Sequence, residues 1–268
     1  MKSNYFTVVY LCNKYNADTN AFLEELHTKL NVNVVQMCDS DEGIIYSEKV
    51  SVMHFPDSVC REHGYINSNI GDSHTHIRKN PIALDKALYY LCELDKSDFV
   101  FIIEEDCFVP FPLTIQNLFD NYGKSDLVVA NNFYNDGSAM DWHWSNVYPL
   151  IQPPYYYSMV CAVGVSRKML DCIKKYKEEN NTLLYCEVMF NTLAMQNNLN
   201  VICAFELLSV VWMGDWGIDE FLLLPDNIFH PRKDIENHKA LRVELTEGIL
   251  SRRKPSKNRL PPFITDLM

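Results

Sequence analysis

Three consecutive acids, Glu104, Glu105 and Asp106, follow an uninterrupted apolar run over residues 99–103. A run of this kind is typical of a strand that is buried on both faces of a sheet. Ligands of open α/β sheets bind at the carboxyl edge of such strands. Adjacent carboxylates repel one another, so a cation is their natural partner, and carboxylate oxygens suit Mg²⁺ or Mn²⁺. The motif therefore predicts a divalent-metal site, with a solvated strand end as the alternative.

The segments around this motif predict the sheet that positions it. Residues 6–12 and 32–37 have the composition of strands, and residues 21–30 between them carry apolar side chains at helical spacing. Strand, helix and strand in this order favour a parallel sheet with helical crossovers. We expect an α/β fold in one domain over residues 1–248, with a mostly parallel central sheet flanked by helices. A basic tail that contains prolines is predicted to follow over residues 249–268.

Further elements follow from the same patterns of apolar residues. A helix is predicted to start at Pro81, because proline suits the first turn and apolar residues recur behind it. Residues 42–80 show little periodicity and are predicted to be irregular. The remaining predicted strands cover residues 127–130, 156–165, 201–205 and 209–212, and the remaining predicted helices cover residues 168–179 and 187–196.

Composition limits the partners and the compartment. The 268 residues carry 24 Lys and Arg against 35 Asp and Glu, a net charge of −11, which argues against a nucleic-acid partner. Nine cysteines are scattered singly without a C-x-x-C pair, as expected for reduced thiols rather than a disulfide framework. The N-terminal apolar run is too short for a signal peptide or a membrane span. We therefore expect a cytoplasmic protein.

The block over residues 76–110 has a basic segment, a helix, an apolar strand, an acidic motif and then Pro110. This order resembles nucleotide-sugar glycosyltransferases of the GT-A fold, in particular the inverting N-acetylglucosaminyltransferases. The chain is also similar in size to soluble glycosyltransferases of large algal DNA viruses. The resemblance covers residues 5–235, and only the block 76–110 is specific. Glu105 departs from the family pattern, which usually has Asp in the middle of the motif.

The resemblance implies an activity and a set of ligands. It implies transfer of a sugar from a nucleoside-diphosphate donor to a glycan or glycoprotein acceptor, with inversion at the transferred carbon and with Mn²⁺ or Mg²⁺. UDP is the nucleotide that it favours, with UDP-xylose or UDP-N-acetylglucosamine as donors. Asp106 would be the metal ligand, and Glu104 and Glu105 would support the sugar, the ribose or metal-bound waters. Asp39 would hold the base or ribose, or it is a turn cap.

Basic residues and a late histidine complete the expected donor site. Arg78 and Lys79 are candidates for the diphosphate, because charge-assisted contacts to phosphate favour Arg and Lys. The resemblance implies that His230 is a second metal ligand, and that the neighbouring Arg232 and Lys233 hold the diphosphate or replace the metal. A surface basic pair and a structural histidine are the alternatives.

Glu187 is the candidate catalytic base, because it begins a predicted helix and the family segment there carries an Asp or Glu. In an inverting transfer one carboxylate on the acceptor side takes the proton of the attacking hydroxyl. A helix N-terminal Glu favoured by the macrodipole is the alternative. Asp215 and Asp219 are reserve candidates, whereas His74 and His76 lack the neighbours that would complete a metal site.

Aromatic residues follow the acidic motif in the chain and are candidates for acceptor recognition. Sugars pack their C–H faces on aromatic rings, while their hydroxyls bond to nearby polar groups. Packing in the core is the alternative for each of them. The candidates are Trp142, Trp144, Tyr155, Tyr156, Tyr157, Trp212 and Trp216.

Three other functions compete with sugar transfer. A sugar-nucleotide pyrophosphorylase would open with a glycine-rich phosphate loop after the first strand, but residues 11–16, LCNKYN, contain no glycine. A non-catalytic protein that binds carbohydrates or nucleotide sugars would keep the fold without turnover. A hydrolase is the weakest alternative, because adjacent acids do not flank a scissile bond.

Overall fold

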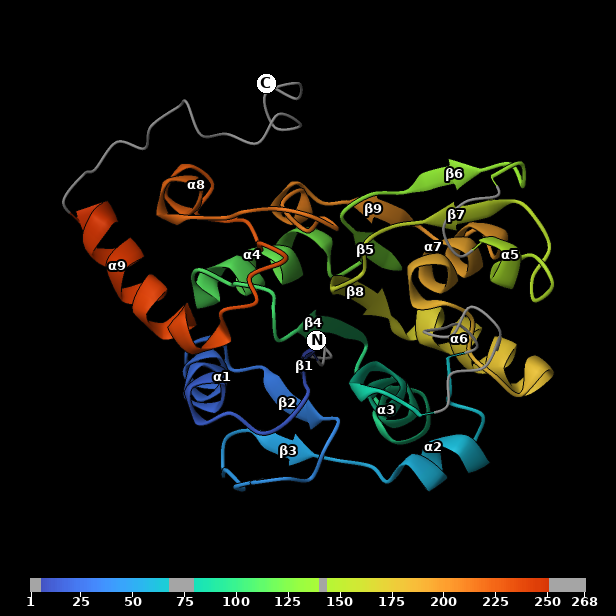
Figure 1. Cartoon of the computed structure of the whole chain (residues 1–268), viewed down its shortest axis with the longest axis horizontal. Helices are drawn as coiled ribbons and strands as arrows, with labels where there is room; N and C mark the ends of the chain where they lie inside the picture. The colour runs from blue at the N-terminus through green and yellow to red at the C-terminus, as the bar shows by residue number, and fades with distance from the viewer. Residues whose placement is uncertain (1–5, 68–79, 140–143, 251–268) are drawn as a thin grey trace.

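A computed structural model describes residues 6–67, 80–139 and 144–250 of the chain. Within them a central sheet of seven strands runs through the molecule (Figure 1). Its spatial order is β3 (Ser51–Met53), β2 (Asn33–Cys38), β1 (Phe6–Cys12), β4 (Phe99–Glu104), β8 (Ala162–Ser166), β5 (Leu127–Val129) and β9 (Val201–Cys203). Four neighbouring pairs are parallel, and β8 alone runs against its neighbours β4 and β5. The predicted α/β class with a mostly parallel sheet is confirmed.

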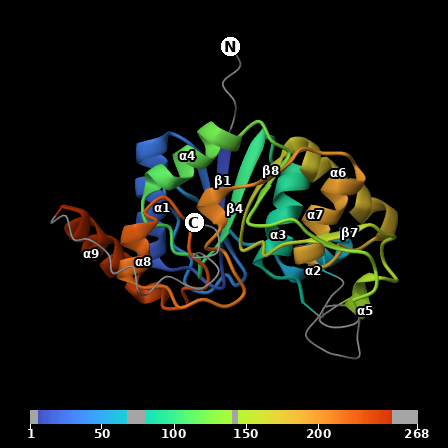
Figure 2. The same cartoon turned by 90° about the horizontal axis from the view of Figure 1, so that it is seen from above.

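Helices cover both faces of the sheet (Figure 2). One face packs against α1 (Ala17–Leu30) and α4 (Pro112–Tyr122), and the other packs against α3 (Ala83–Tyr89), α6 (Arg167–Asn180) and α7 (Cys186–Gln196). Strand β1 serves both layers, because Val8 and Tyr10 join one apolar cluster while Val9 and Leu11 join the other. Burial on both faces explains why β1 and β4 read as continuous apolar runs.

Helix α1 starts earlier than its apolar spacing predicted. The Asn16 side chain accepts a hydrogen bond from the Thr19 backbone N–H at 2.9 Å and caps the first turn. Asn20 in this turn donates to Gln36 of β2 at 3.1 Å, so a polar contact fixes the start of the helix against the sheet. The helix ends at Asn31 in the left-handed conformation (φ 53°).

Residues 156–165 were predicted to form one strand, and this prediction is wrong because the segment forms parts of two strands in different sheets. It divides into β7 (Tyr155–Tyr157), which pairs antiparallel with β6 (Phe133–Asn135) in a separate hairpin, and β8 of the central sheet. The break occurs at Ser158, whose backbone N–H donates to the Glu187 carbonyl and whose hydroxyl accepts from Asn131 N–H. The predicted strand over residues 209–212 is also wrong, since only an isolated bridge from Val210 to His230 forms there.

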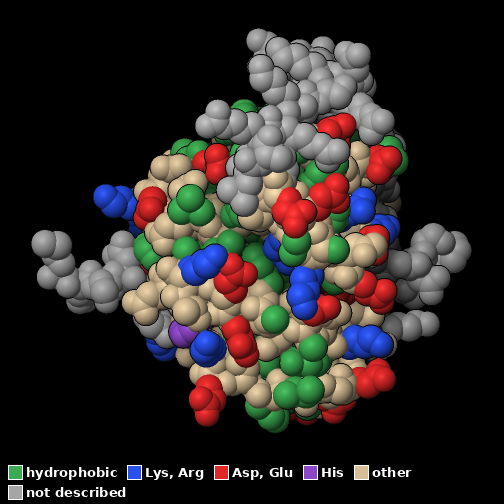
Figure 3. Space-filling view, turned by 90° about the vertical axis from the view of Figure 1, so that its left-hand side faces the viewer, with side chains coloured by type: hydrophobic (Ala, Val, Ile, Leu, Met, Phe, Trp, Pro, Cys, Tyr) green, Lys and Arg blue, Asp and Glu red, His purple; other side chains and the backbone are tan. Residues whose placement is uncertain are grey.

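Short elements fill the remaining described segments. Residues 42–67, predicted to be irregular, hold β3 and α2 (Asp57–Glu62), and α5 (Trp144–Val147) follows the β6 strand. Towards the end, α8 (Ile218–Leu223) and α9 (His238–Leu250) pack together around Phe108 and Phe229 in a third apolar cluster. The face that carries α1 and α9 shows acidic and basic side chains interspersed (Figure 3). Among the described helices, none is long and apolar enough to cross a membrane.

Candidate active site

The acids of the motif lie where three parallel strands end together. Strands β1, β2 and β4 run in the same direction, so Asn13, Asp39 and the segment Glu104 to Asp106 reach the same edge of the sheet. Strand β8 runs the opposite way and therefore begins at this edge. Cys161, directly before β8, accepts the Glu104 backbone N–H at 2.7 Å. The edge thus gathers side chains from distant parts of the chain.

Four of these side chains form a compact group, the edge cluster, which consists of Glu104, Asp106, Cys161 and His230. Their ligand atoms all lie within 4.8 Å of one another. His230 Nε2 is 3.4 Å from Asp106 Oδ2, and His230 Nδ1 is 2.7 Å from the Val211 carbonyl oxygen. Because a carbonyl only accepts, Nδ1 carries the proton and Nε2 faces the carboxylates, the usual orientation of a metal-binding imidazole.

Burial and the neighbouring charges shift the pKa values of the acids and the histidine in the edge cluster. Burial raises the pKa of Glu104, and the nearby charge of Asp106 adds to this, while a hydrogen bond from the Cys161 thiol opposes it. Burial alone would lower the pKa of His230, but the hydrogen bond to Asp106 and its charge raise it above the ordinary value. Asp106 Oδ1 is buried and has no hydrogen-bond partner among the described residues. A bound cation would satisfy this oxygen and stabilise both carboxylates.

The donor set fits Mn²⁺. Carboxylate oxygens suit hard divalent ions, and an imidazole nitrogen in the same group favours a transition ion over Mg²⁺. Burial raises the pKa of the Cys161 thiol well above its usual range, and sulfur is a softer ligand than the oxygen and nitrogen donors that Mn²⁺ prefers. Glu104, Asp106 and His230 are therefore the residues that would hold a metal.

A cavity of about 370 Å³, the edge cavity, opens beside the edge cluster. Its size lies within the range of small-molecule sites, and both acidic and apolar groups face it. Its walls come from the ends of β1, β2 and β4, from the start of α3 and from the segment before α9. They are Leu11, Cys12, Asn13, Asp39, Ile82, Ala83, Leu84, Glu104, Glu105, Asp106, Lys233 and Ile235.

Asp39 is held in this wall by a buried lysine that the sequence analysis did not single out. Lys86 on α3 is 1% exposed, and its Nζ lies 2.9 Å from Asp39 Oδ1 and 3.1 Å from Asp57 Oδ1. It also donates to the Asp39 backbone carbonyl. The sequence did carry a signal for this contact, because Lys86 stands among the apolar residues of the predicted helix. A lysine buried on such a helix needs carboxylate partners, so acidic residues are expected nearby.

Glu105 and Lys233 line the edge cavity but lie outside the edge cluster. Glu105 accepts the Asn13 backbone N–H at 3.1 Å, which fixes it towards the end of β1. Burial raises its pKa, and this backbone hydrogen bond partly offsets the effect. Lys233 brings a cation to the same cavity. Arg78 and Lys79, the other predicted phosphate contacts, lie outside the described residues.

Arg232 holds the backbone next to the edge cluster. Its backbone N–H donates to the Asp106 carbonyl at 2.7 Å, and its guanidinium donates to the Trp216 carbonyl at 3.1 Å. It is not among the residues that line the edge cavity. Its described contacts therefore position Asp106 rather than reach into the cavity.

Glu187 lies at the start of α7, as predicted, and close to the edge cluster. Its negative charge adds to the effects of burial and of Asp106 in raising the pKa of Glu104. The Cys186 thiol donates to Glu187 Oε2 at 2.8 Å, which orients the carboxylate. The reserve candidates Asp215 and Asp219 do not belong to the edge cluster.

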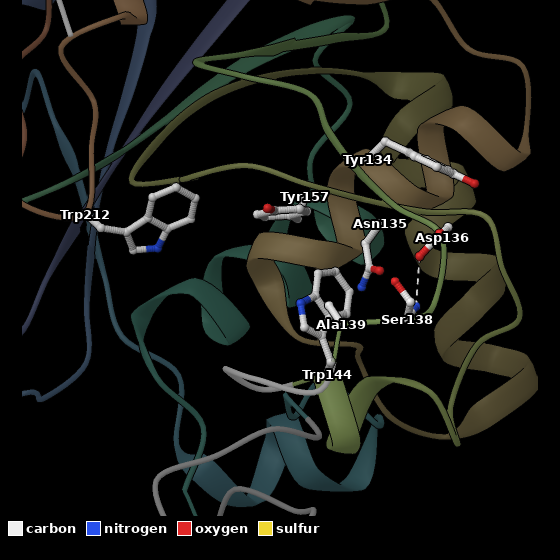
Figure 4. Close-up of a pocket in the computed structure, with 8 residues that line it drawn as sticks. All are labelled: Tyr134, Asn135, Asp136, Ser138, Ala139, Trp144, Tyr157 and Trp212. Atoms are coloured by element: carbon white, nitrogen blue, oxygen red, sulfur yellow. Dashed lines mark hydrogen bonds between the residues drawn. The ribbon is translucent and has the colours of Figure 1, made fainter.

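A second cavity, of about 660 Å³, lies beside the β6–β7 hairpin and is called here the aromatic pocket (Figure 4). Three of the predicted acceptor aromatics line it, together with polar residues of the hairpin that the sequence analysis missed. The lining residues are Tyr134, Asn135, Asp136, Ser138, Ala139, Trp144, Tyr157 and Trp212.

The other predicted aromatics have different surroundings. Trp216 is 1% exposed and donates its indole N–H to the His230 carbonyl at 2.9 Å, so it supports the edge cluster from the core. Tyr155 is buried against Trp144 and Tyr148. Tyr156 packs on Tyr134 across the hairpin, and Trp142 lies outside the described residues.

Comparisons with known proteins give only distant similarities. No family model and no curated protein matches the chain. The galactosyltransferase LgtC, in complex with donor and acceptor sugar analogues, is similar at a TM-score of 0.48 and 12% identity, over 90% of this chain and 96% of that one. Mouse xyloside xylosyltransferase 1 is similar at a TM-score of 0.37 and 11% identity, over 75% and 84%.

A third similar structure is glucosyl-3-phosphoglycerate synthase from Mycobacterium tuberculosis, in complex with Mn²⁺, UDP and glucosyl-3-phosphoglycerate. The TM-score is 0.34 and the identity 14%, over 95% of this chain and 82% of that one. Similarity at this level does not assign an activity, so any assignment depends on the residues at the sheet edge.

Proposed function

We propose that the chain is a GT-A-type glycosyltransferase that moves a sugar from a nucleoside-diphosphate donor to an acceptor hydroxyl. One observation supports this most. Glu104 and Asp106 of the acidic motif and the distant His230 lie within 4.8 Å of one another, beside a cavity of about 370 Å³ at the carboxyl edge of the sheet. Acids at the edge of a small-molecule cavity need a cation there, and a diphosphate is a ligand that shares such a cation.

The edge cavity is the proposed donor site. Asp39, held by Lys86, would accept hydrogen bonds from the ribose hydroxyls or the base. Lys233, which lines the same cavity, would contact the diphosphate, with Arg78 and Lys79 as further proposed contacts. UDP is the nucleotide that the sequence resemblance favours, with UDP-xylose or UDP-N-acetylglucosamine as the proposed donors.

Glu104, Asp106 and His230 would hold Mn²⁺, which when bound neutralises the negative charge that grows on the departing diphosphate. The protein's part is to fix these side chains. The Val211 carbonyl orients the imidazole of His230, and the Arg232 N–H holds the backbone of Asp106.

Glu187 is the proposed base, and we propose inversion at the transferred carbon. It would take the proton from the acceptor hydroxyl as that oxygen attacks the sugar. Its position supports this role, because its backbone carbonyl accepts the Ser158 N–H, and Ser158 directly follows Tyr157 of the aromatic pocket. The charge of Glu187 acts on Glu104 of the edge cluster, and its backbone contacts the segment that leads to the aromatic pocket, so an acceptor bound there would reach this side of the edge cluster.

A direct assay tests the proposed function. The full chain is incubated with UDP- and GDP-sugars, Mn²⁺ and mixed oligosaccharides, and release of the nucleoside diphosphate is measured. We expect release from one donor class, and at least a hundredfold less from Asp106→Asn than from the wild type. The matched control is Asp171→Asn, which removes an exposed carboxylate remote in sequence and keeps the same chemistry of substitution.

Two results would contradict the proposal. Tight binding of a nucleotide sugar without release under any condition would indicate the non-catalytic carbohydrate-binding protein instead. Synthesis of a nucleotide sugar from a nucleoside triphosphate and a sugar phosphate would indicate the pyrophosphorylase.

A further inference from the structure

We infer that the aromatic pocket binds the acceptor, and that this acceptor is an uncharged oligosaccharide of more than one sugar ring. The inference deepens the proposed function and rests on it.

The rings of the aromatic pocket form a surface rather than a packed stack. Trp144 and Tyr157 meet edge to face with centroids 5.3 Å apart, and Tyr157 and Trp212 are tilted by 46° at 6.4 Å. Trp212 lies at one end and Tyr134 at the other, with Tyr157 and Trp144 between them (Figure 4). Trp212 is 40% exposed and Tyr134 59%. Exposed aromatic rings around one cavity indicate a ligand with apolar faces, which sugar rings provide.

Polar groups gather at the end of the pocket that lies away from Trp212 (Figure 4). Asn135 donates to the Tyr148 hydroxyl at 3.1 Å, and the Ser138 backbone N–H donates to Asp136 Oδ1 at 2.9 Å. These hydrogen bonds fix the side chains in place. The bonds from Ser138 also lower the pKa of Asp136, so its carboxylate is charged at neutral pH. A fixed carboxylate and amide are the groups that bind sugar hydroxyls.

The charge of the lining selects among saccharides. Asp136 is the one charged side chain among the eight described lining residues, and none of those eight is Lys, Arg or His. An acidic or phosphorylated sugar would meet the like charge of Asp136 without a cationic partner among the described lining residues. A neutral sugar would not meet this repulsion. The pocket therefore discriminates against anionic acceptors.

The position of the pocket sets the direction of the acceptor. Trp212 follows Val211, whose carbonyl binds His230, and Tyr157 precedes Ser158, whose N–H binds Glu187. The reacting hydroxyl would therefore lie at the end formed by Trp212 and Tyr157, and the remaining rings would extend towards Asp136. A volume of about 660 Å³, nearly twice that of the edge cavity, accommodates more than a single ring.

The test is direct binding of glycans to the full chain in the presence of UDP and Mn²⁺. Probes are neutral trisaccharides built from glucose, galactose, mannose, xylose or N-acetylglucosamine, the matching monosaccharides, and trigalacturonate as the anionic probe. Tryptophan fluorescence or NMR line broadening measures the dissociation constants. We expect at least one neutral trisaccharide to bind ten times more tightly than its monosaccharide, and trigalacturonate not to bind.

Variants assign the binding to this pocket. Trp212→Ala is expected to weaken the trisaccharide at least tenfold, whereas Tyr46→Ala, which removes another exposed aromatic ring, leaves it unchanged. Asp136→Lys is expected to lose the preference for neutral probes and to gain binding of trigalacturonate. Melting temperatures confirm that each variant is folded.

Failure of this inference is distinguishable from failure of the proposed function. If no neutral probe binds, or if the monosaccharide binds as well as the trisaccharide, the inference is wrong, while metal-dependent nucleotide binding still supports the transferase. If neutral glycans bind but no nucleotide sugar does, the proposed function is wrong and the pocket is a saccharide-binding site on its own.

Discussion

His230 and Asp106 lie far apart in the sequence, yet Nε2 of the histidine is 3.4 Å from Oδ2 of the aspartate. Backbone pairing brings them together. Phe108 and Phe229 exchange hydrogen bonds at 2.8 and 3.0 Å, and the Arg232 N–H donates to the Asp106 carbonyl at 2.7 Å. The main chain therefore places the two side chains before any ligand arrives, so the edge cluster is preorganised.

Substituting the histidine tests this arrangement. His230→Ala removes the nitrogen ligand but leaves the Phe108–Phe229 pairing. We therefore expect a folded protein whose affinity for Mn²⁺ is reduced by about 10- to 100-fold. Calorimetric titration with Mn²⁺ alone measures this. His63→Ala, which removes an exposed imidazole, is the control. Equal Mn²⁺ affinity in both variants would contradict the ligand role.

Replacing the proposed base separates catalysis from binding. Glu187→Gln keeps the size of the side chain but removes its capacity to accept a proton, so we expect turnover to fall by about 10²–10⁴-fold. The affinity for the nucleoside diphosphate should not change. Steady-state release of the nucleotide and calorimetry measure the two quantities, with the exposed Glu178→Gln as control. Full activity in Glu187→Gln would show that a group other than Glu187 accepts the proton.

Lys86→Met tests the buried contact behind the edge cavity. The substitution leaves Asp39 and Asp57 without their shared cation, at side chains that are 31% and 41% exposed. Because both carboxylates retain some solvent, we expect a loss of about 1–3 kcal/mol in the free energy of unfolding rather than the full cost for a buried charge. Urea denaturation measures it.

The matched control for Lys86→Met is Lys29→Met. Lys29 forms an ion pair with Glu25 on the surface of α1, with the lysine 60% exposed, so its loss should change the free energy of unfolding by less than about 0.5 kcal/mol. Similar losses in the two variants would show that the buried Lys86 contributes no more than a surface ion pair.

His238 makes the stability depend on pH. Burial lowers its pKa to about 4, although the hydrogen bond to the Arg232 carbonyl partly opposes this. Between pH 6.5 and 4 the unfolded chain binds a proton that the folded chain excludes, so the free energy of unfolding falls as the pH falls. We expect this single group to contribute about 3 kcal/mol over that window.

His238→Gln keeps a donor for the Arg232 carbonyl and removes the titration. The difference in free energy of unfolding between wild type and variant, measured by urea denaturation from pH 7 to pH 4, isolates the contribution. A difference that stays constant over this range would mean that His238 titrates normally in the folded state.

The sequence alone predicted the centre of the sheet well, because the signal there is local. Residues 6–12 and 99–103 are apolar on both faces, and the motif from Glu104 to Asp106 ends that pattern sharply. The position of these acids at the carboxyl edge then follows from the parallel order of β1, β2 and β4.

Features that depend on distant contacts were not predictable. Residues 156–165 read as one strand, since the break at Ser158 is made by hydrogen bonds to Asn131 and Glu187. The antiparallel direction of β8, which brings Cys161 to the edge cluster, was hidden for the same reason. Trp212 and Trp216 are the same residue type in one segment, yet one is 40% exposed and the other 1%, a difference that only the tertiary packing sets.

Calorimetric titration of UDP into the full chain, with and without Mn²⁺, tests the proposed donor site most directly. We expect UDP to bind at least ten times more tightly with Mn²⁺, and this gain to disappear in Asp106→Ala because the metal loses a carboxylate ligand. No binding of UDP, or of GDP as a second nucleotide, under either condition would contradict the transferase. Binding that is independent of both Mn²⁺ and Asp106 would contradict the metal site. Lys233 would then be the main residue that binds the diphosphate.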